Sequence, residues 1–246
     1  MKTRSANIVT RPLAALLAAA ALASSAAGIA QGSGQTGLHA LGAAASRSAQ
    51  PPVPTVLAAT ESSAEDLVDY ALQAQRGKLV AGAKELQAAA GSAGVALRKA
   101  GASPAAVTLL QKRAARVAAL APKASFIRVA LAANAVSQLM PGFYARFSDP
   151  VPPTVLALDY LDREAQLRSI AGEQEAVRAA VVRLGSTWKT LRPRVTGAGG
   201  ASVASRYDAH VAAMTRLAQS GDAASLQREA VRGLDLVDLL EGVFVK

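Results

Sequence analysis

Apolar residues recur at helical spacing through most of the chain beyond residue 60. The clearest run lies in the second half of residues 153–195, where apolar side chains are separated by three or four positions. This run consists of Val177, Val181, Leu184, Trp188, Leu191 and Val195. The spacing places all six side chains on one face of an α-helix, so we expect this face to be packed in a core.

The same stripe becomes polar when it is continued toward the N-terminus. Gln174 and Arg163 fall where the pattern requires apolar residues, and Tyr160 follows Arg163 in the stripe. A buried arginine needs a carboxylate partner, and Asp159 lies one helical turn away. We therefore expect a buried ion pair at Arg163, which either fixes the register of packed helices or contributes to a ligand site.

The complete pattern predicts four helical segments of similar length. They cover residues 61–99, 104–147, 153–195 and 201–244, and turns rich in glycine or proline separate them. Short connections favour antiparallel neighbours. The sequence therefore predicts an all-α protein, an up-down-up-down bundle of four long helices.

Each segment has a weak point near its middle. These points are Gly77 or Gly82, Pro122, Gly172 and Gly221. Glycine and proline disfavour a continuous helix. The bundle is therefore expected to bend or break near mid-height, and five or six shorter helices are the alternative.

The N-terminal region has the layout of a secretory signal peptide. Lys2, Arg4 and Arg11 precede an apolar run at 13–23, and small residues follow. This three-part order is typical of a signal peptide, and the apolar run is shorter than the ~20 residues that span a bilayer. We expect an exported protein, periplasmic or extracytoplasmic, with no transmembrane span after signal removal.

The expected domain boundaries follow from this layout. Residues 1–30 are predicted to be the signal peptide, with cleavage after Ala27 or Ala30. Residues 31–60 are rich in glycine, serine, alanine and proline, which predicts a disordered tether. Residues 61–246 would then form the helical domain.

Composition narrows the possible chemistry. Hydrophobic residues make up 51% of the chain but aromatic residues only 4%, so closely approaching helices are expected rather than a bulky aromatic core. There is no cysteine, which excludes disulfides, c-type haem attachment and thiolate-bound metal or iron–sulfur centres. No haem, iron–sulfur or nucleotide motif is present, and a divalent cation is the cofactor that we consider.

The charge balance indicates acidic partners. The formal net charge of +10 falls to +7 when the three basic residues of the predicted signal peptide are removed. A basic exported protein is expected to meet anionic lipid, cell-wall polymer or another exported protein. Nucleic acid is not expected, because the chain lacks a recognition motif and interleaved aromatic residues.

An up-down-up-down bundle would gather carboxylates at one end. Three of the four segments carry acidic pairs at positions i and i+3, which share a helix face. The carboxylates concerned are Asp66, Asp69, Asp159, Asp162, Asp235, Asp238 and Glu241, and Tyr160 lies among them. With oxygen ligands converging, these residues are candidates for a divalent cation or small-ligand site. The alternative is that they pair with nearby arginines or face water.

The opposite end of such a bundle would be basic. The basic side chains expected there are Lys99, Lys112, Arg113, Arg116, Lys189, Arg192, Arg194 and Arg206. Lys189, Arg192 and Arg194 follow Trp188 and are candidates for binding an anion, although a solvated basic face is the alternative.

No catalytic arrangement is indicated. His39 lies in the predicted tether, and His210 follows Asp208 by two positions, which does not place the two on one helix face. Nucleophile-elbow, zinc-helix and phosphate-loop motifs are all missing from the sequence.

The functional expectation is therefore binding. The leading hypothesis is an exported, non-enzymatic helical protein with a cation or ligand site at its acidic end. The alternative is an interaction or holdase-like protein that uses a basic face on anionic lipid, cell-wall polymer or client proteins.

Overall fold

The computed structural model describes residues 50–245, and all regular secondary structure in this range is helical. The helices are α1 (Thr55–Leu72), α2 (Arg76–Lys99), α3 (Pro104–Leu120), α4 (Phe126–Ser137), α5 (Met140–Tyr144), α6 (Pro153–Ile170), α7 (Gln174–Gly197), α8 (Ala201–Ser220) and α9 (Ala223–Phe244). The all-α prediction is confirmed. Among these helices none has both the length and the apolar character needed to cross a membrane.

The N-terminal predictions fall mostly outside the described residues. The predicted signal peptide and the predicted tether as far as residue 49 lie there. Within the described part, α1 already begins at Thr55, and Pro52 forms an isolated β-bridge with Ser148 in the linker between α5 and α6. The predicted tether boundary at residue 60 is therefore too late.

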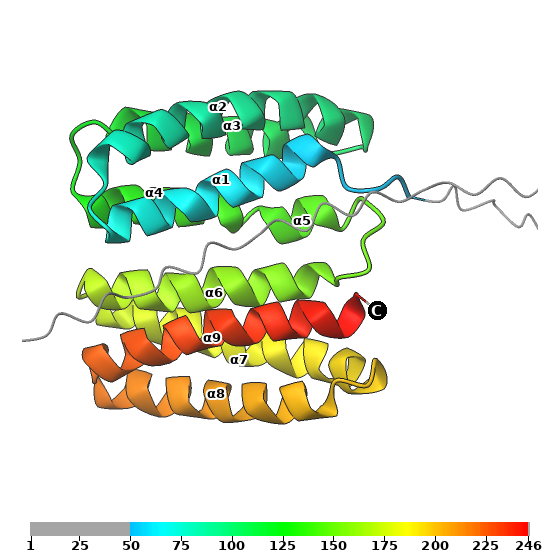
Figure 1. Ribbon diagram of the computed structural model, residues 1–246, viewed down its shortest axis with the longest axis vertical. Helices are drawn as coiled ribbons and strands as arrows, with labels where there is room; N and C mark the ends of the chain where they lie inside the picture. Colours follow the sequence, from blue (N-terminus) through cyan, green and yellow to red (C-terminus); the bar gives the residue numbers. More distant parts are fainter. Residues whose placement is uncertain (1–49, 246) are drawn as a thin grey trace, which may run out of the picture. The chain divides into compact units, whose positions relative to one another are not determined.

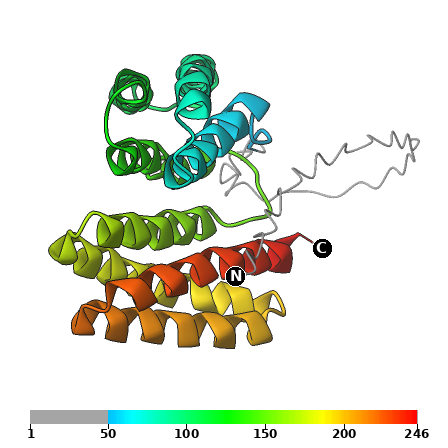
Figure 2. The same ribbon diagram turned by 60° about the vertical axis from the view of Figure 1, so that its left-hand side comes forward.

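The helices close into two rings of four, which are distinct in Figures 1 and 2. In the first ring, α1 and α3 each pack against both α2 and α4. In the second ring, α7 and α9 each pack against both α6 and α8, although α6 and α9 make more extensive contact than α8 and α9. Helix α6 also contacts α4 and α5, so it joins the second ring to the first.

The prediction of four long helices is wrong. Each predicted segment turns back on itself, so residues 61–99 form α1 and α2, and residues 153–195 form α6 and α7. The alternative of five or six helices also falls short of the number in residues 50–245. A reversal lets the two halves of one apolar stripe pack against each other. In a continuous helix both halves would have to pack against other helices.

Most reversals occur at the predicted weak points. Gly172 and Gly221 adopt φ values of 74° and 76°, in the left-handed region that favours glycine after a helix. Pro122 lies in the turn between α3 and α4. The first reversal is different, because Gly77 lies within α2 and the left-handed residue is Ala74, with φ of 55°.

Arg76 fixes the turn between α3 and α4 against the start of α2. Its Nη1 donates to the carbonyl oxygen of Ala121 and its Nη2 to that of Ala124, both at 2.7 Å. Its guanidinium also lies 4.2 Å from the centroid of the Phe126 ring. The side chain satisfies carbonyl groups that the end of α3 leaves unpaired.

Each ring has its own core. Buried apolar side chains of α1 to α5 form one cluster, which Leu167 of α6 joins, and those of α6 to α9 form a second. The six residues of the predicted stripe in 177–195 are all buried in the second core. Alanines such as Ala83, Ala90 and Ala114 are fully buried in the first core, in line with the expected close approach of helices.

Candidate functional site

Helix α6 carries polar groups on two buried sides. Eleven of its eighteen residues are buried, because it lies between the remainder of the second ring and the helices of the first. Asp159, Asp162 and Arg163 are among these buried residues. The polar interruption in the predicted stripe therefore marks the helix at the junction of the two rings.

Arg163 is buried and pairs with Asp159, as its position in the stripe led us to expect. Its Nη1 lies 2.6 Å from Oδ2 of Asp159, and its Nη2 lies 3.3 Å from Oε1 of Glu65 in α1. The interaction with Glu65 ties α6 to the first ring. Carboxylates on two sides of the guanidinium offset the cost of burying its charge.

Two further groups complete this cluster. The hydroxyl of Tyr144 in α5 donates a hydrogen bond to Glu61, one helical turn before Glu65. We call Glu61, Glu65, Tyr144, Asp159 and Arg163 the junction cluster. The cluster holds three carboxylates for one guanidinium, so it is acidic.

Burial and repulsion alter the titration of these acids. Burial raises the pKa of Glu61 to about 7, and the charges of Asp159 and Glu241 add to the effect. Burial and the charge of Asp159 also raise the pKa of Glu65, although Arg163 opposes this. The junction cluster therefore holds protons near neutral pH that an exposed carboxyl would have lost.

A second cluster lies on the other side of α6, inside the second ring. His210 of α8 lies between two carboxylates, with Nε2 at 2.9 Å from Oδ1 of Asp162 and Nδ1 at 2.9 Å from Oε1 of Glu229. The hydroxyl of Tyr207 donates to Oδ2 of Asp162 at 2.8 Å. We call these four residues the histidine cluster. It satisfies the fully buried Asp162 with partners from α8.

The histidine cluster favours a charged imidazole. Burial alone lowers the pKa of His210, but the hydrogen bonds and charges of Asp162 and Glu229 outweigh it and leave the pKa above its ordinary value. Burial raises the pKa of Asp162, although the bonds from His210 and Tyr207 oppose the rise. His210 is only 2% exposed. The arrangement therefore stabilises the packing of the second ring of helices and does not present a reactive group to solvent.

Sequence reasoning missed the partners of His210. The nearest acid in the sequence is Asp208, two positions away, but the carboxylates that contact His210 come from α6 and α9. A signal was present, because His210 is spaced by three from Tyr207 and by four from Met214, both of which are buried. A histidine within an apolar stripe indicates a buried polar partner.

The carboxylates predicted to converge are divided among different surroundings. Asp159 and Asp162 are buried but belong to different clusters, while Tyr160 is buried beside Arg183, whose guanidinium lies 5.9 Å from the ring centroid. Glu241 is close enough for its charge to act on Glu61. The remaining candidates are exposed: Asp66, Asp69, Asp235 and Asp238.

Among residues 50–245 no group of three or more acids and histidines is arranged to hold a metal ion. Of the exposed acids, Asp69 acts on Arg163 through its charge, whereas Asp66 lies near Glu85. The acids nearest to Arg163 are Asp159 and Glu65, and Glu65 was not among the candidates.

The predicted anion-binding residues are exposed on α7. Arg192 is engaged by Asp208, with Nε at 2.9 Å from both carboxylate oxygens. Trp188 donates its indole N–H to the same carboxylate at 2.7 Å. Lys189 and Arg194 are exposed nearby. An anion at this position would have to compete with Asp208 for Arg192.

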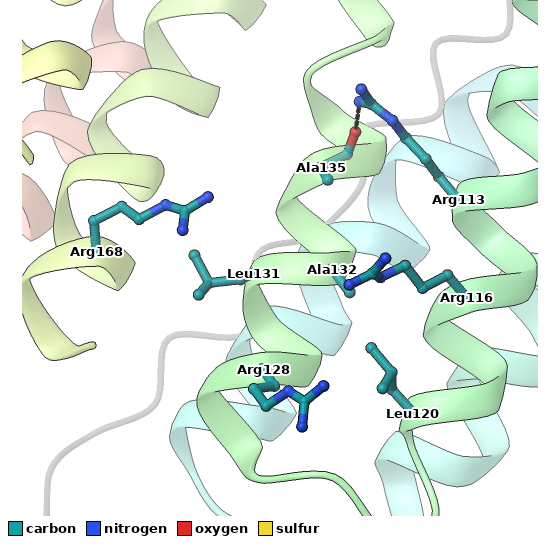
Figure 3. A pocket seen from close by; sticks show the side chains of 8 residues that line it. All are labelled: Arg113, Arg116, Leu120, Arg128, Leu131, Ala132, Ala135 and Arg168. Carbon is teal, nitrogen blue, oxygen red and sulfur yellow. Dashed lines mark hydrogen bonds between the residues drawn. The ribbon is translucent and has the colours of Figure 1, made fainter. Parts of the chain in front are cut away.

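A different group of basic residues lines a pocket on the first ring and α6. The pocket has a volume of about 360 Å³, and four arginines surround it. Figure 3 shows them with the apolar side chains beside them. We call this the arginine pocket, and its lining residues are Arg113, Arg116, Leu120, Arg128, Leu131, Ala132, Ala135 and Arg168.

Two of the four arginines are fixed by protein groups. Arg113 donates to the carbonyl oxygen of Ala135, drawn in Figure 3, and to Oε1 of Gln138 at 2.9 Å. Arg168 donates from Nε to Oε1 of Glu164 at 2.7 Å and also pairs with Glu173. Glu164 and Glu173 are the carboxylates closest to the pocket's arginines among the described contacts.

The other two arginines are exposed. Arg116 extends from α3 toward α4, and Arg128 projects from the N-terminal part of α4 (Figure 3). Neither forms an ion pair with another residue of the described range 50–245. Their guanidinium groups are therefore free to bind a ligand.

The sequence indicated only half of this pocket. Arg113 and Arg116 belong to the predicted basic end. Arg128 lies beyond Pro122 in the same predicted segment and Arg168 lies in the next one, and long continuous helices would have kept these two away from the basic end. The reversal at Pro122 brings α4 back beside α3, and the contact of α4 with α6 adds Arg168.

Comparison with protein-family models, with curated proteins and with solved structures found no match for this chain. The function is therefore inferred from the geometry of the chain's own residues.

Proposed function

We propose that this is an exported, non-enzymatic binding protein that holds an anionic ligand in the arginine pocket. The observation that carries the proposal is the gathering of four guanidinium groups from three helices around one pocket of about 360 Å³. This is a form of the basic-face function that the sequence left as the alternative.

Electrostatics favours an anion at this position. Four guanidinium groups face two carboxylates, which leaves the pocket positive by two charges. The positive guanidinium groups repel one another, and the attraction of a bound anion to each of them offsets this repulsion. Arginine presents a planar fork of N–H donors that matches carboxylate and phosphate oxygens in pairs. The pocket thus has both the charge and the donor geometry for an anion.

The carboxylates that were predicted to converge are less suited to binding a cation. Asp159 and Glu65, the acids closest to the centre of the junction cluster, already contact Arg163, which takes the position that a cation would need. A cation site built from the exposed acids stays a prediction. The observed geometry therefore favours the anion.

The proposal predicts that anion binding depends on the two free arginines. In the double variant Arg116→Gln/Arg128→Gln, binding of anions should weaken at least ~tenfold, because each lost charged hydrogen bond contributes about 1.5–3 kcal/mol. Isothermal titration calorimetry with phosphate, carboxylate and sulfate anions measures the effect.

The matched control removes the same charge elsewhere. Arg206 and Arg216 are exposed on α8, outside the pocket, so Arg206→Gln/Arg216→Gln should leave affinity within about twofold at fixed ionic strength. Equal loss in both double variants would mean that net charge alone attracts the anions, and the pocket would then have no specific role.

A further inference from the structure

We infer that the group held in the arginine pocket is a phosphate monoester. This inference rests on the proposed function, because it identifies the chemistry of the anion at the same pocket.

The charge of the pocket matches a dianion. Arg168 is shared by Glu164 and Glu173, so its side of the pocket carries no positive surplus. The remaining three arginines carry three positive charges, and with the net charge of −1 on Arg168 and its two carboxylates the pocket keeps a surplus of two. Of these three, Arg113 is bonded only to neutral acceptors. A phosphate monoester carries a charge of about −1.5 to −2 at pH 7, whereas a phosphodiester or a single carboxylate carries −1.

The available donors match three terminal oxygens. Arg116 approaches from α3 and Arg128 from α4, so their forks reach the pocket from different helices (Figure 3). Arg113, held by Ala135 and Gln138, adds a third guanidinium in a fixed orientation. A monoester offers three terminal oxygens to these groups, but a diester offers only two.

The pocket also has a place for the carbon-bearing part of the ligand. Leu120, Leu131, Ala132 and Ala135 line it together with the arginines. Inorganic phosphate would leave this apolar wall exposed to water, and an ester group would cover part of it. The ligand is therefore an ester with an apolar portion and not the free ion.

Two sources could supply such a group. One is a small soluble phosphate ester, and the other is the headgroup of a lipid with a terminal phosphate. The chemistry recognised is the same, and the two sources differ only in whether the ester is presented at a membrane surface.

The test compares matched ligands by isothermal titration calorimetry on the purified protein. Butyl phosphate should bind at least ~tenfold more tightly than dibutyl phosphate, which has one charge less, and more tightly than inorganic phosphate or glutarate. In Arg116→Gln/Arg128→Gln this preference should disappear, while Arg206→Gln/Arg216→Gln should keep it. Unchanged melting curves would show that the variants are folded.

A second arm identifies the source with vesicles of matched surface charge. Preferential binding to phosphatidic acid over phosphatidylglycerol, combined with weak binding of butyl phosphate, assigns the monoester to a lipid. The reverse result assigns it to a soluble ligand.

Two outcomes would overturn the inference, and they differ in what they leave standing. Equal affinity for mono- and diesters, or a preference for glutarate, removes the phosphate monoester but leaves an anion-binding pocket. If no anion binds in a manner that depends on Arg116 and Arg128, both the inference and the proposed function fail.

Discussion

Gly233 of α9 allows the histidine cluster to form. A Cβ atom at this position would lie 2.6 Å from Nε2 of His210 and 2.7 Å from Cγ of Asp162. These distances are too short for any side chain, so the backbone of α9 can lie against the cluster only where the residue has no side chain. One glycine thus controls how closely α9 packs on α6 and α8.

We expect Gly233→Ala to destabilise the protein by about 2 to 3 kcal/mol, because the methyl group forces apart a close-packed, hydrogen-bonded core. Chemical denaturation measures the change. The control is Gly242→Ala in the same helix, where an added Cβ meets no atom within 4 Å. That change should be neutral or stabilise by up to ~1 kcal/mol, since alanine favours helix. Similar effects at both positions would refute the account of the cluster.

At the scale of the element, α6 is unusual because it is buried on two sides while carrying charges on both. Arg163 and Asp159 face the first ring, and Asp162 faces α8 and α9. Such a helix cannot be moved without separating paired charges, which is costly in a low dielectric. The two clusters therefore fix the register of α6 between the rings.

The junction cluster makes stability depend on pH. The pKa of Glu61 is raised from 4.5 to about 7, so between these values the folded state holds a proton that the unfolded state has lost. The contribution of Glu61 to the free energy of unfolding should therefore be fully present below pH 4.5. It should be lost as the pH rises through 7, by about 3 kcal/mol. The raised pKa values of Glu65, Asp162 and His210 act in the same direction.

Denaturation measured from pH 4.5 to 8 tests this dependence. Glu61→Gln keeps an acceptor for Tyr144 but removes the titration, so its stability should change less with pH and exceed that of the native protein at pH 7.5. The matched control is Glu175→Gln, whose side chain is 91% exposed and which should leave the pH profile unchanged. A native stability that rises between pH 5 and 7 would contradict this interpretation.

At the scale of the whole molecule, the chain reverses at three of the four weak points that the sequence indicated. The all-α fold and three of the four mid-segment breaks followed from the positions of glycine and proline. The direction of the chain after each break could not be predicted, because a bent helix and a reversed one bury the same stripe. The turn at Ala74 was missed, since alanine carries no sign of a left-handed conformation.

The same ambiguity limited what the sequence could say about sites. The pair Arg163 and Asp159 was predictable because both residues lie on one helix. Contacts between helices were not predictable, because they depend on how the helices pack in the two rings. Examples are the hydrogen bonds of Glu61 and His210 and the placement of Arg116 and Arg128 at one pocket. Local spacing identifies partners within an element, and the topology decides partners between elements.

The central claim is that an anion is held by the free arginines of the pocket. Nuclear magnetic resonance of arginine Nε–Hε groups during titration with butyl phosphate locates the binding site residue by residue. We predict saturable shifts in the signals of Arg116 and Arg128, with those of Arg206 and Arg216 unchanged. Shifts confined to Arg192 and Arg194 on α7, or no saturable shift at any arginine, would contradict the claim.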